Sequence, residues 1–285
     1  MKKRNESKIT MAALMMMAAM AMTSCASSKK INGDSNVSKD SEMGKNEEDL
    51  DNSYLVLSDT QQDIVKKNNA FALRLFNKIS DMESKVVSPM SVSYLMGMLA
   101  NGADGITQQE ILKAIGCEGV SVNDLNELYK AMLFTANKQD NQTTVNIANY
   151  IAVNKNFQLN KDFCQKVSDS YLAGIESLDF TSSKSTDRIN GWCKEKTNGM
   201  IPRIIDQVSA DAVSYLMNAI YFKGTWQNKF NAKDTKLENF RGYTRDIQKV
   251  EMMHQVKKLF YAENKDFKAV DLPYGNGRSR MPSSA

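Results

Sequence analysis

Side chains able to catalyse a reaction are few in this sequence. His254 is the only histidine, so a serine or cysteine nucleophile activated by a histidine base would have to use it. Its surroundings, Met252, Met253 and Gln255, fit a strand. No Walker loop, GxGxxG or HExxH motif occurs. We therefore predict no enzymatic activity, no catalytic residue and no cofactor, and interpret His254 as an exposed or half-buried structural residue.

The cysteines offer little metal or redox chemistry. They are Cys25, Cys117, Cys164 and Cys193, and no two are in CxxC spacing. With a single histidine in the chain, a zinc site is disfavoured, so we predict no bound metal. Two of the last three could form a disulfide in an exported protein, and the sequence leaves their pairing open. The interpretation we favour is three buried or half-buried thiols.

Cys25 stands at the end of a targeting segment. Residues 1–24 have a basic start, an apolar core at Ile9–Met22 too short to span a membrane well, and a small-residue end. The sequence MTSC at residues 22–25 resembles a bacterial lipobox. We predict a signal peptide over residues 1–24 and a lipid on Cys25. The lipid would hold the exported protein at a membrane, facing the periplasm or on the cell surface. The alternative is an ordinary secretory signal.

The charge balance excludes a nucleic-acid-binding role. The chain has 37 basic and 33 acidic residues, of which four basic and one acidic lie in residues 1–24. The remaining chain carries a charge of +1, far from the strongly basic balance of nucleic-acid-binding domains. Residues 25–57 are rich in Ser, Lys, Asn and Asp and poor in large apolar residues, so we predict a flexible tether there.

The elements that must position any site begin at Ser58, which opens a capping box. A short strand is expected at Lys85–Val87, and Ser88-Pro89 starts a second, largely buried helix. A second capping box is expected at Thr107–Glu110. Helices come first, strands are interleaved with them, and the last part is mostly strands, at 235–243, 247–253, 258–263 and 267–272. This order predicts an α+β fold with mixed or antiparallel sheets.

The segment Asp211–Phe230 is the most informative element. Its apolar run is short, is rich in Val, Ile, Tyr and Phe, and ends at Lys223-Gly224, which is typical of a strand covered on both faces. Asn218 lies inside this run, so its amide must find partners or cost a few kcal/mol.

From about Val65 to Gly277 the chain resembles the serpin family. Six motifs occur in the family's order. They are VSPMSV at 87–92, LANGADG at 99–105 with Thr107 and Glu110-Ile111, INGW at 189–192 with TNGMI at 197–201, NAIYFKGTW at 218–226, VEMM at 250–253 and LPY at 272–274.

The resemblance implies a serpin-like domain at residues 58–277 and, for the complete protein, inhibition of a serine or cysteine protease by insertion of its own loop into the large sheet. It implies that Asp211–Phe230 holds the central strand of that sheet. It also implies that Ser88, Ser91 and Asn218 form a polar cluster where the sheet opens, and that Trp226 lies at the top of the sheet where the loop enters.

The family pattern stops at Gly277. Residues 278–285 are polar, contain Pro282 and lack strand alternation, so we interpret them as a tail outside the family. The reactive loop would then be missing from these 285 residues, and we expect the chain as written to be inactive and poorly soluble. The alternative is a non-inhibitory serpin-like surface-binding lipoprotein or a gene remnant.

Overall fold

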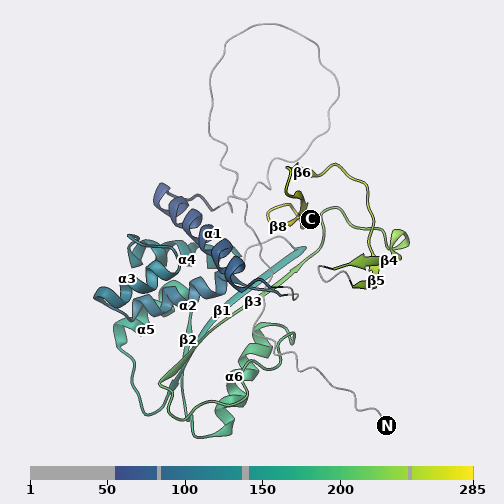
Figure 1. The fold of residues 1–285 in the computed structure, drawn as a ribbon. Coiled ribbons are helices and arrows are strands. Elements are labelled where there is room, and N and C mark those ends of the chain that lie inside the picture. The colour runs from purple at the N-terminus through teal and green to yellow at the C-terminus, as the bar shows by residue number, and fades with distance from the viewer. Residues whose placement is uncertain (1–54, 82–84, 137–140, 243–245, 285) are drawn as a thin grey trace, which may run out of the picture.

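The computed structural model describes residues 55–81, 85–136, 141–242 and 246–284. It is an α+β fold, as the order of elements predicts. Five helices gather on one face of a three-stranded sheet, and a sixth helix lies on the other face (Figure 1). The first five are α1 Asp59–Ile79, α2 Pro89–Asn101, α3 Gly105–Ala114, α4 Val122–Ala136 and α5 Lys161–Tyr171, and the sixth is α6 Ser183–Lys196.

Two of the three predicted helix starts are confirmed. The Ser58 hydroxyl accepts a hydrogen bond from the Gln61 backbone N–H, and the Ser58 backbone N–H donates one to Gln61 Oε1. Ser88 caps α2. The capping box at Thr107 is wrong, because α3 begins at Gly105, where the Asp104 carboxylate accepts the Gly105 N–H at 2.7 Å. Lys85–Val87 is not a strand in this structure, since none of the described strands pairs with it.

The large sheet has the order β2-β1-β3. Its strands are β1 Thr143–Asn154, β2 Gly174–Leu178 and β3 Ser214–Gly224. Strand β1 runs parallel to β2 and antiparallel to β3, and Asn149 lies directly opposite Asn218. The expected central place of β3 is therefore wrong for the described residues, in which β3 is an edge strand paired only with β1. An apolar run reports that both faces of a strand are covered, not how many neighbours its backbone has.

The two faces of the sheet pack into two separate hydrophobic cores. Ile147 and Ile151 of β1 and Ile220 of β3 pack with the five helices. Tyr150 of β1 and Met217 of β3 pack against α6 instead. Four consecutive residues of β3, 217–220, are buried, which confirms that its middle is covered on both faces.

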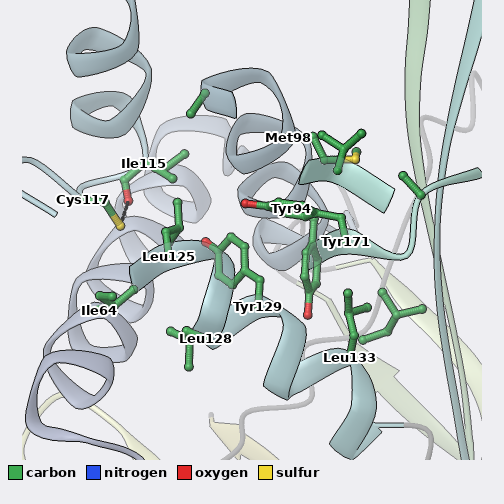
Figure 2. Packing of buried hydrophobic residues seen from close by; sticks show 14 of the residues in the cluster. Ile64, Tyr94, Met98, Ile115, Cys117, Leu125, Leu128, Tyr129, Leu133 and Tyr171 are labelled. Carbon is green, nitrogen blue, oxygen red and sulfur yellow. Dashed lines mark hydrogen bonds between the residues drawn. The ribbon is translucent and has the colours of Figure 1, made fainter. Parts of the chain in front are cut away.

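Three tyrosines form the centre of the helical core. Tyr94 of α2, Tyr129 of α4 and Tyr171 of α5 come together among leucines and isoleucines (Figure 2). Their ring centroids are 4.9 to 6.3 Å apart, and two of the three ring pairs are T-shaped, a favoured aromatic geometry.

The remaining strands build two small sheets. Strands β4 Lys236–Arg241 and β5 Ile247–Met252 form a hairpin, and β6 Phe260–Glu263, β7 Lys268–Pro273 and β8 Arg280–Ser284 form an antiparallel sheet in that order. These confirm the predicted strand-rich end of the chain. The exclusion of a strand from residues 278–285 is wrong, because β8 pairs with β7. Pro282 is tolerated there because β8 is an edge strand.

Candidate functional site

The two serines of the predicted polar cluster lie together at the start of α2. The Ser88 hydroxyl accepts the Ser91 backbone N–H at 3.2 Å, and the two side-chain oxygens are 2.8 Å apart. Ser88 is buried and Ser91 half-buried. This hydroxyl pair satisfies the first turn of a helix that packs against β3.

Asn218 lies within the buried part of β3 and bonds across the strand pair. Its Nδ2 donates to Asn149 Oδ1 at 2.8 Å and, more weakly, to the Ala148 carbonyl at 3.4 Å. Its Oδ1 is buried and accepts no hydrogen bond from the residues that the structure describes. A buried acceptor left in this state costs about 1–3 kcal/mol.

The structure therefore brings Ser88 and Ser91 together but does not join Asn218 to them. No hydrogen bond within the described part of the chain links the Asn218 amide to either serine. The amide pairs instead with Asn149, which faces it across β1 and β3 and shares its face of the sheet. The sequence analysis did not identify Asn149. Asn149 directly precedes the apolar run YIAV at residues 150–153, and a polar amide beside an apolar strand is the same signal that marked Asn218.

Trp226 lies two residues beyond the end of β3. Its indole stacks on the Tyr274 ring, and an isolated β-bridge joins the two residues. Backbone hydrogen bonds from Gln227 N to Pro273 O and from Gly275 N to Thr225 O fix the same junction. Trp226 thus connects the end of β3 to the turn between β7 and β8.

The described cysteines and histidine carry no sign of catalysis. Cys117 and Cys193 are buried, Cys164 is half-buried and all three are free, which confirms the favoured interpretation. Burial raises the pKa of Cys117 to about 11 and also raises that of Cys193. His254 is partly exposed and lies 3.1 Å from Glu238. Within the described residues no group of three His, Cys, Asp or Glu side chains is placed to hold a metal.

The predicted lipid anchor, Cys25, lies outside the described residues, as do the whole predicted signal peptide and most of the tether. Among the helices that the structure describes, none has the length and apolar character needed to cross a bilayer.

Comparison with known proteins assigns the family. The family model described as Serpin (serine protease inhibitor) matches residues 66–282. This match includes residues 278–282, which the sequence analysis interpreted as part of a tail outside the family. Serine protease inhibitor 42Dd of Drosophila melanogaster is 30% identical over 213 residues, 73% of this chain and 57% of the relative. Leukocyte elastase inhibitor of Bos taurus is 32% identical over 216 residues, 73% of this chain and 56% of the relative.

Solved structures agree. The thermophilic serpin tengpin in its latent state has a TM-score of 0.72 and 30% identity, over 81% of this chain and 62% of that one. A loop C-sheet serpin polymer has a TM-score of 0.70 and 31% identity, over 78% and 58%. The fold is thus that of a family of protease inhibitors rather than enzymes. The chain belongs to the serpin family, and it spans a little over half the length of the curated relatives named here.

Proposed function

We propose that this chain is the receiving scaffold of a serpin-type inhibitor of a serine or cysteine protease. The observation that carries the proposal is the backbone of β3, which is paired with β1 on one side and with no strand in the described residues on the other. An unpaired strand edge offers a row of N–H and C=O groups to an incoming strand. The strand at this edge is the one that resembles the central strand of the sheet into which the family inserts its loop.

The side chain of Asn218 supports the same role. Its buried Oδ1 has no donor among the described residues, so an inserted strand that supplied one would remove a cost of about 1–3 kcal/mol. In this proposal Ser88, Ser91 and Asn218 line the place where the sheet opens, and Trp226 marks where the loop enters.

We further propose that residues 1–285 do not contain the bait segment. The alignments cover 57% and 56% of two relatives whose names describe them as inhibitors, so a large part of each relative has no counterpart in the aligned segment. The chain by itself is then a non-inhibitory scaffold, while specificity for a protease resides outside it.

Adduct formation tests the inhibitor proposal. The 285-residue chain and a product that includes the coding sequence downstream of residue 285 are each incubated with trypsin, elastase and papain. We expect an SDS-resistant adduct from the longer product and none from the shorter chain. An adduct from the shorter chain would overturn the missing bait segment. Simple cleavage of both products would overturn inhibition and favour the non-inhibitory alternative.

We also propose that the protein is an exported lipoprotein anchored through Cys25, supported by the MTSC sequence at the end of the apolar core. Labelled palmitate should be incorporated into the wild-type chain and into Cys164→Ala, a matched thiol control, but not into Cys25→Ala. Equal membrane association of Cys25→Ala and the wild type would reject the anchor.

A further inference from the structure

We propose that the polar site at Asn218 is one end of a hydrogen-bonded chain of side chains that ties β3 to α2. The chain continues through Asn149, Tyr171, Asn126 and Asn101. The role given to Asn218 rests on the proposed function, but the connection itself rests only on the contacts below. It assigns Asn149 and Tyr171 as positioning residues for the sheet-opening site.

The first half of the chain crosses the sheet. Asn218 Nδ2 donates to Asn149 Oδ1 at 2.8 Å, and Asn149 Nδ2 donates to the Tyr171 carbonyl at 2.7 Å. That carbonyl belongs to the last residue of α5, where helix carbonyls lack partners within the helix. The following residue, Leu172, has φ 51° and ends the helix in the left-handed region. Asn149 therefore caps α5 from the sheet and at the same time holds the amide of Asn218.

The second half runs through the helices. The Tyr171 hydroxyl donates to Asn126 Oδ1 at 2.8 Å. Asn126 and Asn101 exchange amide hydrogen bonds at 2.8 and 2.9 Å, and Asn101 Nδ2 also donates to the Gly97 carbonyl at 2.8 Å. Tyr171 thus carries the connection from its backbone on the sheet side to its hydroxyl on the α2 side, and its ring packs beside the other two tyrosines of the core (Figure 2).

The fit around the Tyr171 hydroxyl requires a glycine in α2. A Cβ placed on Gly97 would lie 2.4 Å from the Tyr171 hydroxyl oxygen, closer than any real contact. Glycine in a helix interior costs about 0.5–1 kcal/mol relative to alanine, so its presence indicates that this close approach is needed. The phenol is held against α2 and directed at Asn126.

Burial makes the members of this chain interdependent. The exposed fractions are 0% for Tyr171, 3% for Asn149 and 7% for both Asn126 and Asn218. Hydrogen bonds in such surroundings polarise one another, and a partly broken network leaves unpaired polar groups. A donor that reaches the free Oδ1 of Asn218 would polarise the amide and strengthen its bond to Asn149. The Tyr171 carbonyl and hydroxyl are joined only through the saturated Cα and Cβ, so a change at the open edge of β3 reaches α2, whose first turn holds Ser88 and Ser91, through the position of the Tyr171 side chain.

A double-mutant cycle on the full chain tests the connection without any protease. Asn218→Ala and Tyr171→Phe are made singly and together, because the phenylalanine keeps the ring and backbone and removes only the hydroxyl. Each variant raises the unfolding equilibrium constant by some factor. We expect the factor for the double variant to be smaller than the product of the two single factors by about threefold or more. In the control cycle, Tyr129→Phe takes the place of Tyr171→Phe. The Tyr129 hydroxyl bonds to Asn68, which is not a member of the hydrogen-bonded chain. There the effects should multiply to within about twofold.

Hydrogen exchange in α2 separates connection from general destabilisation. Asn218→Ala should speed exchange of the amides around Asn101 in the wild-type background and add nothing further in the Tyr171→Phe background. If Asn218→Ala does not fold, Asn218→Ser takes its place with the same expectations. Multiplicative effects in both cycles, or α2 exchange that does not respond to residue 218 while the protein is folded, would overturn the proposal. Neither outcome depends on whether the protein inhibits a protease.

Discussion

The Trp226 indole lies flat against the Tyr274 ring, with centroids 4.2 Å apart and planes 13° from parallel. Phe222 and Phe230 meet the same aromatic pair, Phe222 at the Tyr274 ring and Phe230 at the Trp226 ring, each at a steep angle. This cluster joins the end of β3 to the sheet of β6, β7 and β8. Gly224 allows the junction, because a Cβ at that position would lie 2.7 Å from the Tyr274 ring.

Trp226→Ala should loosen this junction. Trp226 is only half-buried, so we expect a cost of about 2 kcal/mol, below the 3–5 typical of a fully buried aromatic residue, and roughly a 30-fold shift toward the undocked sheet. Limited proteolysis between β5 and β6 measures the undocked fraction. Trp226→Phe keeps an aromatic face for stacking and should lose much less. Equal protease resistance of Trp226→Ala and the wild type would show that the stack does not hold the sheet.

Tyr94→Phe should be neutral or stabilising. The Tyr94 hydroxyl is fully buried and has no hydrogen-bond partner among the described residues, so its removal takes away an unsatisfied polar group. Tyr171→Phe, in the same aromatic cluster, should instead cost about 1 kcal/mol, because it removes the buried hydrogen bond that the hydroxyl donates to Asn126 Oδ1. Urea unfolding of both variants makes the comparison. A larger loss for Tyr94→Phe than for Tyr171→Phe would contradict this account.

Acid should weaken the attachment of α6 to the sheet. Burial tends to raise the pKa of Glu176, but hydrogen bonds from Tyr150 and Arg188 outweigh it and leave that pKa below its ordinary value. A carboxylate with a lowered folded-state pKa stabilises the fold above its unfolded pKa and loses that contribution as pH falls through the folded value. Between about pH 5 and pH 3 the wild type should therefore lose more stability than Glu176→Gln. Urea midpoints at each pH measure the stability of both proteins. An equal loss of stability in the wild type and Glu176→Gln would contradict this prediction.

Thiol labelling should distinguish Cys164 from the other two described cysteines. Cys164 is half-buried, whereas Cys117 and Cys193 are buried and have raised pKa values. In native protein at neutral pH, N-ethylmaleimide should modify Cys164 well before the other two, and urea should expose all three. Peptide mapping reads each position separately. Early labelling of Cys117 in the native protein would contradict the packing around it.

Local signals foresaw much of this fold. The capping box at Ser58, the Ser88-Pro89 helix start and the covered strand around Asn218 each depend on residues close together in sequence, and each is confirmed. The predicted start of α3 at Thr107 is wrong because Asp104 competes with Thr107 as a cap, and sequence spacing does not rank the two.

Pairing was harder to foresee than element type. Strand β8 forms because β7 offers it a partner, although its own residues lack alternation. The partner of Asn218 is set by the register of β1 and β3, which places Asn149 opposite it. Register is a long-range property, and the resemblance to serpins named only the serines as neighbours.

The measurement that tests the central claim most directly is hydrogen exchange along β3 with a strand-forming peptide present. In an antiparallel pair only alternate amides bond to the neighbouring strand, so about half of those in β3 point to its open edge. A peptide of small residues as long as the 11 residues of β3 is added, with a proline-containing version as control. The account predicts that the small-residue peptide slows exchange of the outward amides of Ser214–Gly224 by about tenfold or more, and that the proline-containing peptide does not. Unchanged exchange of those amides at saturating peptide would contradict it.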